Sequence, residues 1–164
     1  MTADRGSLRL ELGGGDGAVA VVWDLDGLAA LGELDGPPFE LAAALDARRW
    51  ELARIVSGAF EDGRLLAIAA ARPRGAAGHG AETVAGALVR GGEAAILDEA
   101  LLSVEYDAGG RTRRIGLELY ETPGSLPLRV AGDRRAGEDD GDVLLDLRTD
   151  GVTGTGRLSL LRPV

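Results

Sequence analysis

The stretch LLSVEYDAGGRTRRIGLELYE, residues 101–121, decides the fold, because both of its halves alternate apolar and polar side chains. A period of two is typical of strands with one buried face, and the glycines between the halves favour a turn. A slip of one residue would move a whole set of side chains to the opposite face. The two apolar sets share a face only if the loop has an even number of residues, which predicts that Leu102 faces Ile115.

Two further stretches have the same character. Residues 55–70, IVSGAFEDGRLLAIAA, place an Asp-Gly pair at 62–63 between two apolar runs, and residues 142–161, DVLLDLRTDGVTGTGRLSLL, place another at 150–151. Asp-Gly between apolar strands is a strong local indication of a two-residue hairpin turn. The chain is therefore predicted to contain three antiparallel hairpins.

The hairpin at 142–161 also predicts its own register. With a two-residue turn at 150–151, Val143 lies opposite Leu158. The same counting sets two leucines opposite two glycines, and glycines at these positions leave room for a bulky group; the pairs are Leu145 with Gly156 and Leu147 with Gly154.

The N-terminal part adds further strands. Residues 8–12, LRLEL, alternate as a first strand, and residues 18–23 form an apolar strand that ends at Trp23. The stretch 28–50 has apolar residues at both helical and strand spacings, and we favour strands there. Residues 1–6 are expected to be disordered.

Two segments are predicted to be loops from their composition. Residues 73–80, PRGAAGHG, are rich in glycine, and residues 131–142, AGDRRAGEDDGD, are rich in charge. Neither is long enough to link two domains. Counting the strands gives about eight to ten, with little helix, in a single domain over residues 1–164. The predicted fold is all-β: an antiparallel lipocalin-like (calycin-type) barrel or a strongly curved sheet.

Composition excludes several classes of function. The chain has no cysteine and one histidine, His79, so neither a disulfide framework nor a metal cluster is expected. The net charge is −9, and all 18 basic residues are arginines, so binding to nucleic acid or to an anionic membrane surface is not expected. No apolar run approaches the roughly 20 residues that span a bilayer, and the N-terminus lacks the apolar core of an export signal. A cytoplasmic protein without a cofactor is expected.

The sharpest chemical motif is VVWDLDG at residues 21–27, which resembles the first motif of haloacid-dehalogenase-type phosphatases. The resemblance implies that Asp24 is the nucleophile, Asp26 the general acid and base, and Mg²⁺ the counter-charge. Such carboxylates need the carboxyl end of a parallel strand. The alternative is a strand end followed by an Asp-Gly turn, which the surrounding hairpins favour.

Residues 57–73, 99–121, 129–134 and 150–163 together resemble the C-terminal domain of the hydroxyneurosporene synthase (carotenoid hydratase) and AttH-like superfamily. The resemblance implies a lipocalin-like barrel that takes isoprenoid- or polyketide-like molecules, which some members hydrate or cyclise. The superfamily pairs two barrels, whereas this chain has about half that length, as though only the second barrel were present. The resemblance carries over no catalytic residue.

Candidate site residues therefore come from the strands themselves. Gly116, Glu118 and Tyr120 share one face, where a buried glutamate would have a raised pKa and could protonate a double bond. The alternative is a solvent face with Glu118 paired to an arginine, which we favour because charged residues are seldom buried alone. Trp23, Trp50 and Tyr106 are further candidates for ligand contact, although core positions explain them as well.

The predicted function is the binding of a small apolar molecule in a barrel cavity, with catalysis open. The alternatives are a hydratase or cyclase acting on such a molecule, a non-catalytic structural or oligomerisation domain, and the Mg²⁺-dependent phosphatase. Edge strands left by an incomplete pair of barrels would also favour a homodimer.

Overall fold

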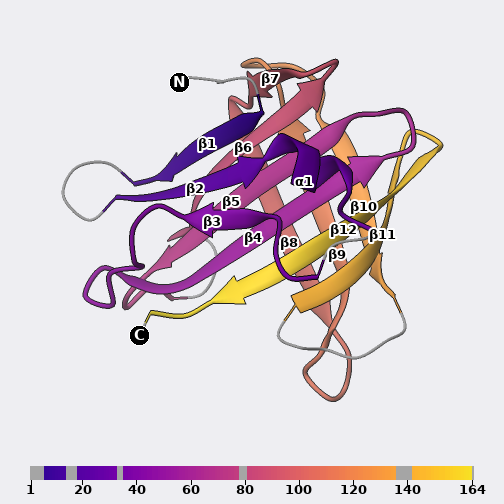
Figure 1. Cartoon of the computed structure of the whole chain (residues 1–164). Coiled ribbons are helices and arrows are strands. Elements are labelled where there is room, and N and C mark those ends of the chain that lie inside the picture. The colour runs from indigo at the N-terminus through magenta and orange to yellow at the C-terminus, as the bar shows by residue number, and fades with distance from the viewer. Residues whose placement is uncertain (1–5, 14–17, 33–34, 78–80, 136–141, 164) are drawn as a thin grey trace.

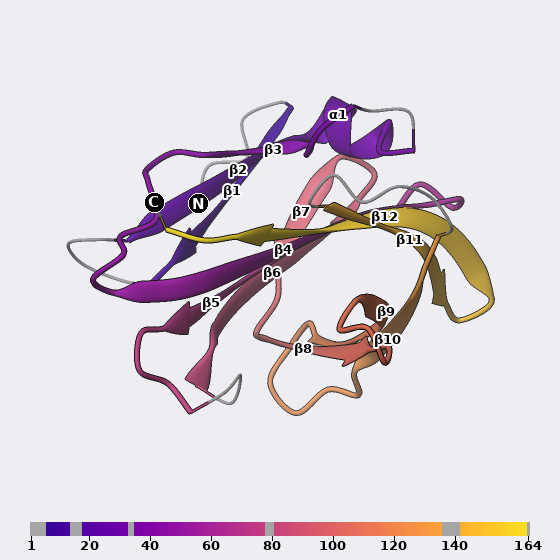
Figure 2. The ribbon, with the colours of Figure 1, turned by 90° about the horizontal axis from the view of Figure 1, so that it is seen from below.

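The structure is a computed structural model, and it describes residues 6–13, 18–32, 35–77, 81–135 and 142–163. Most of the described residues lie in a large antiparallel sheet that curls into a half-barrel (Figures 1 and 2). Its nine strands follow the order β7-β6-β5-β4-β12-β11-β10-β9-β8. Their bounds are β4 Trp50–Phe60, β5 Leu65–Pro73, β6 Thr83–Arg90, β7 Glu93–Ile96, β8 Glu99–Tyr106, β9 Thr112–Tyr120, β10 Leu128–Arg134, β11 Asp142–Thr149 and β12 Val152–Leu161.

A second, three-stranded sheet lies against the outside of the curl, over β4, β5 and β6 (Figure 2). It consists of β1 (Ser7–Leu12), β2 (Val19–Asp24) and β3 (Phe39–Leu41), and the short helix α1 (Leu25–Ala29) follows β2. The antiparallel all-β prediction is confirmed. The first two strands, however, form a separate layer and not part of one continuous barrel.

The three predicted hairpins are present as β4–β5, β8–β9 and β11–β12. The two-residue turn predicted at 62–63 was wrong: Phe60 N–H donates to the Arg64 carbonyl, so the loop has three residues and Ala59 lies opposite Leu65.

At β11–β12, Val143 lies opposite Leu158 as predicted, and Leu145 and Leu147 lie opposite glycines. Asp150 and Gly151 both have positive φ, as a tight hairpin turn of this kind requires.

The register predicted for β8–β9 was wrong by two residues. Leu102 pairs with Leu117, and it is Val104 that lies opposite Ile115. The error has two causes. The loop has three residues, 108–110, where an even number was predicted, since Asp107 N–H donates to the Arg111 carbonyl. An irregularity between Glu105 and Tyr106 shifts the pairing by one residue more. An irregularity of this kind adds a residue to one strand, which counting along the loop cannot foresee. The apolar sets of β8 and β9 still share the inner face.

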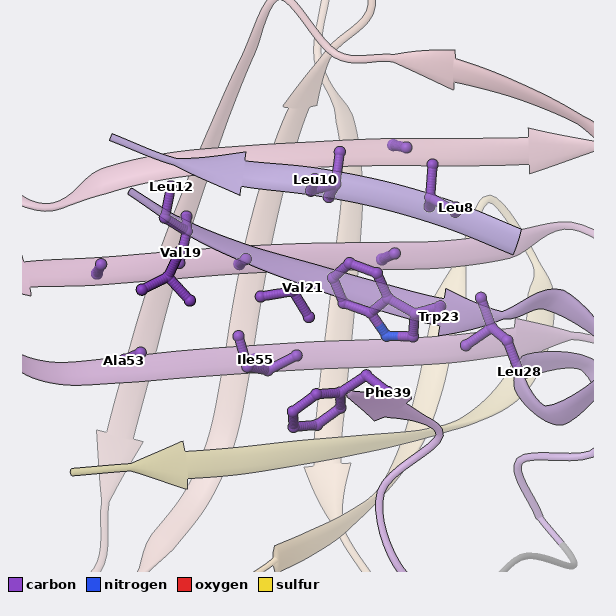
Figure 3. Packing of buried hydrophobic residues seen from close by; sticks show 14 of the residues in the cluster. Leu8, Leu10, Leu12, Val19, Val21, Trp23, Leu28, Phe39, Ala53 and Ile55 are labelled. Carbon is purple, nitrogen blue, oxygen red and sulfur yellow. The ribbon is translucent and has the colours of Figure 1, made fainter. Parts of the chain in front are cut away.

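Two apolar clusters stabilise the molecule, one on each face of the large sheet. The first lies between the sheets, where Trp23, Val21 and the leucines of β1 pack on Ile55 and on alanines of β4, β5 and β6 (Figure 3). Trp23 is fully buried and donates a 2.9 Å hydrogen bond from Nε1 to Ser57 Oγ. Small alanines on the large sheet allow the second layer to pack closely against it.

The second cluster fills the inside of the curl. Its larger members are Phe60, Ile68, Ile115, Leu145 and Leu147. Strands β4 and β5 therefore alternate between the two clusters and are apolar on both faces, which explains their nearly continuous apolar sequence.

Leu147 occupies the space that the glycines provide. A Cβ added at Gly58 would lie 2.5 Å from Leu147 Cδ1, and one at Gly156 would lie 2.8 Å from the same atom. A Cβ at Gly132 would lie 2.9 Å from Leu147 Cδ2. The room expected beside these glycines is thus taken by a side chain of the protein itself.

An ion pair is also buried on the inner side of β4. Arg54 Nη2 donates to Glu82 Oε1 at 2.7 Å, Arg54 Nε donates to Glu82 Oε2 at 3.3 Å, and both side chains are only 3% exposed. Two parallel hydrogen bonds satisfy the planar guanidinium and compensate in part for its removal from water.

Two further sequence expectations need correction. Among the described residues of the stretch 28–50, those in strands are β3 and the first residue of β4, and residues 25–29 are helical, with Asp24 as the N-cap. Residues 131–134, predicted as loop, belong to β10, and Asp142 begins β11. Asp133 lies on the outer face and pairs across the sheet with Arg114 and Arg148. The expectation for residues 1–6 concerns positions of which only Gly6 is described, and His79 lies outside the described residues. No helix in the described part of the chain has the length and apolar character to cross a bilayer.

Candidate functional site

The candidate site is a groove on the outer face of β8, β9, β10 and β11, because the inner face is occupied by packed side chains. It has a volume of about 680 Å³ and opens to solvent, and the β11–β12 turn lies at one end. We call it the outer groove. The residues that matter for its chemistry are Ser103, Gly116, Glu118, Arg129, Ala131 and Arg148.

A transverse row of small residues forms the floor of the groove. Strand pairing places Ala131 opposite Gly116, and Gly116 opposite Ser103, so three neighbouring strands contribute one small residue each. Arg148 continues the row on β11. A Cβ at Gly116 would lie 2.8 Å from Ser103 Oγ, and this is its sole neighbour within 4 Å. The sheet surface is therefore hollow along this row because no side chain stands on it.

An ion-pair network forms one wall. Asp133 accepts a 2.8 Å hydrogen bond from Arg114 and a 2.6 Å hydrogen bond from Arg148. The hydrogen bonds from Arg114 and then Arg148 hold the pKa of the Asp133 carboxyl below its usual value. Arg148 is therefore oriented by a carboxylate while 55% of its side chain remains exposed.

The opposite wall carries two residues that the sequence singled out. Glu118 lies 3.5 Å from Arg129 and accepts a 3.3 Å hydrogen bond from the Tyr120 hydroxyl. Desolvation, followed by the neighbouring Glu118 carboxylate, raises the pKa of Tyr120. Because the Glu118 side chain is 39% exposed and lies beside an arginine, the arrangement matches the solvent-face alternative.

The aromatic candidates lie apart from this groove. Trp23 and Trp50 are both buried in the cluster between the sheets, and the Arg49 guanidinium lies 4.8 Å from the centre of the Trp50 ring. Tyr106 is 52% exposed near the end of β8. Glu118 is thus the only one of the five candidate residues that lines the groove, and Tyr120 contacts it through Glu118.

The aspartates of the VVWDLDG motif line a second hollow, also of about 680 Å³, beside β2 and β3. Asp24 accepts a hydrogen bond from the Asp26 backbone N–H and so caps α1. Strand β2 pairs antiparallel with both of its neighbours, so the parallel strand end that the phosphatase mechanism needs is not found here. Asp35 and Glu40 add further negative charge, which disfavours binding of a phosphate.

Within the described ranges, no group of three or more acidic or histidine side chains is arranged to hold a metal ion. Comparisons with protein-family models, with curated proteins and with solved structures found no match. The site must therefore be interpreted from its own chemistry.

Sequence reasoning did not identify Arg129, Ala131 and Arg148. Their place in the groove depends on the pairing of β10 with β9 and β11. Pro123-Gly124 marks a turn between β9 and β10, but a turn in a longer loop does not fix the register of the strands. The alternation in RVAGDR was a usable signal, but its charges indicated a loop.

Proposed function

We propose that this protein binds a small, mostly apolar molecule with an acidic end in the outer groove. The observation that carries the proposal is the row of small residues, Ala131, Gly116 and Ser103, which leaves a hollow of ligand size between two charged walls. Volumes of about 300 to 1,000 Å³ are typical of small-molecule sites. The packed inner cluster supports the outer face over the interior as the place of binding.

The charges of the walls favour an acidic end on the ligand. Arg129 and Arg148 both line the groove, and their side chains are 77% and 55% exposed. A guanidinium has five N–H donors, so an ion pair with Glu118 or Asp133 leaves donors for a carboxylate or sulfonate. The acidic hollow beside β2 has the opposite character. An isoprenoid or polyketide carboxylic acid fits this chemistry.

Binding without catalysis is favoured over the hydratase alternative. Protonating a double bond needs an acid that holds its proton in a site shielded from water. Glu118 is half-exposed and paired with Arg129, which supports a role in orienting the arginine.

Fluorescence titration with 1-anilinonaphthalene-8-sulfonate, an apolar probe with an acidic group, tests the proposal. We expect saturable binding, and loss of it in Ala131→Phe, because a phenyl ring fills the floor of the groove. The matched control is Leu144→Phe, which adds a ring at an exposed position on the same sheet outside the groove lining. Circular dichroism should show both variants folded.

A second pair of variants tests the acidic end. The double variant Arg129→Gln with Arg148→Gln should weaken binding of the sulfonate probe by about tenfold, the size expected for two exposed charge-assisted contacts. Binding of the neutral N-phenyl-1-naphthylamine should not change. Probe binding that survives Ala131→Phe but is lost when a residue of the inner cluster is replaced by a larger one would place the ligand inside the curl. That result would contradict the proposal.

A further inference from the structure

Strand β8 forms one edge of the nine-stranded sheet, and this edge has features of a docking site. In the described part of the chain β8 pairs only with β9, so the main-chain groups on its other side have no strand partner. Ala100, Leu102 and Val104 contribute to the inner cluster. The intervening residues face outward, and Leu101 and Tyr106 are two of the few large apolar side chains that are exposed, at 47% and 52%. A long edge strand with apolar side chains is a template for pairing with another chain.

The charge of this edge selects among partners. The segment Asp98–Asp107, DEALLSVEYD, has two carboxylates at each end and no basic residue. Glu105 is paired with Arg113 at 2.9 Å, with both side chains more than half exposed, and this pairing leaves the rest of the edge acidic.

A second copy of the chain fits this edge poorly. Two registers pair nearly the whole of β8 antiparallel with itself while keeping the outer faces together. They place Glu99 of one copy opposite Glu105 or Asp107 of the other, and like charges directly opposite each other are destabilising. Each chain also has a net charge of −9. The edge is therefore protected against self-pairing but not against a partner of opposite charge.

We propose that the β8 edge binds an extended peptide segment with an apolar centre and arginine or lysine near both ends, which adds a tenth strand to the sheet. Main-chain hydrogen bonds supply affinity in this mode, and alternate side chains supply specificity. The apolar centre lies beside Leu101, and the basic ends lie beside Glu99 and Glu105.

Fluorescence anisotropy of the labelled peptide RTVTVTR, whose arginines have the same six-residue spacing as Glu99 and Glu105, tests the proposal with the full chain. We expect saturable binding that weakens as salt rises. Two derivatives provide a matched pair: one N-methylated at the two valines and one N-methylated at the first and last threonines, so that opposite edges of the peptide are blocked. Strand addition uses one edge only, so one derivative should bind like the parent and the other should not bind. Equal binding of the two derivatives would overturn strand addition.

Variants of the protein locate the site. The double variant Glu99→Gln with Glu105→Gln should weaken binding of the peptide by about threefold to tenfold, the range for two exposed charge pairs. The control Glu11→Gln with Glu40→Gln removes the same charge from exposed positions in β1 and β3. Equal loss in both pairs would show a general effect of net charge and contradict a site at β8. Sedimentation that shows a dimer strengthened by the Glu99→Arg variant, which replaces a like-charge pair by an opposite-charge pair, would assign the edge to a second copy and also overturn the proposal.

Discussion

The inside of the curl and the outer groove both have small residues grouped on neighbouring strands, with opposite results. Inside, Gly58, Gly156 and Gly132 surround Leu147, whose side chain fills the space they leave. Outside, Gly116 and its neighbours in the row have no such side chain above them, and a hollow remains. Small residues therefore make a site only where no neighbour occupies the space.

The largest expected effect concerns the inner side of β4. Replacing Glu82 by Gln leaves the Arg54 guanidinium buried without its full counter-charge. We expect a loss of about 3 to 5 kcal/mol in the free energy of unfolding, measured by urea denaturation. The exposed pair Arg113–Glu105 is the comparison, and Glu105→Gln should cost less than about 1 kcal/mol. Similar losses in the two variants would contradict the role assigned to burial.

Leu147→Ala should empty the space among the three glycines. We expect a destabilisation of about 2 to 5 kcal/mol, from lost burial and the cavity left behind. The inside of the curl would then resemble the outer groove, so the variant should also bind a small neutral apolar probe that the parent does not bind at that place. Leu144→Ala, at an exposed position of the same strand, is the control and should change stability by less than about 0.5 kcal/mol.

Adding one methyl group at Gly58, inside the curl, and at Gly116, in the outer groove, compares the space beside the two glycines directly. Gly58→Ala places a Cβ 2.5 Å from Leu147 Cδ1, and overpacking of this kind costs about 1 to 3 kcal/mol. Gly116→Ala meets only the flexible Ser103 hydroxyl, so we expect a change within about 0.5 kcal/mol. The cost of Gly58→Ala should shrink in a Leu147→Ala background. If Gly58→Ala and Gly116→Ala change the melting temperature equally, the space beside the two glycines does not differ as described.

The smallest effect is the pH dependence from the wall of the groove. Arg114 and Arg148 hold the pKa of Asp133 below its usual value in the folded protein. A carboxyl with a depressed folded pKa contributes stability above its unfolded pKa of about 3.9, and this contribution is lost as pH falls through the lower folded value. Asp133→Asn should therefore lower the melting temperature slightly at pH 7 and not at the lowest pH at which the protein stays folded. An equal difference at both ends would show that packing, and not charge, is responsible.

The pattern of residues was enough to predict that the three hairpins exist, and at β11–β12 it also predicted the register, because a two-residue turn fixes the pairing of the strands it joins. The Asp150-Gly151 turn sets Leu147 opposite a glycine. At β4–β5 the loop has three residues, so the pairing is shifted by one. The same logic missed the register of β8–β9, since the loop has three residues and an irregularity at Glu105–Tyr106 adds one more residue to one strand only. It also assigned residues 131–134 to a loop, because charges that pair across an exposed sheet face resemble those of a solvated segment.

The sequence by itself determined that the chain is all-β and antiparallel, and that the Asp150-Gly151 turn fixes the register of β11–β12. Only the tertiary structure decided that the first strands form a separate layer, that Leu147 closes the interior, and that Glu118 lies beside a groove with Arg129 and Arg148. The physical reason is the separation along the chain over which each kind of signal acts. Alternation and turn chemistry act between residues close in the chain, whereas the occupancy of a space depends on side chains brought together from strands that no local signal connects.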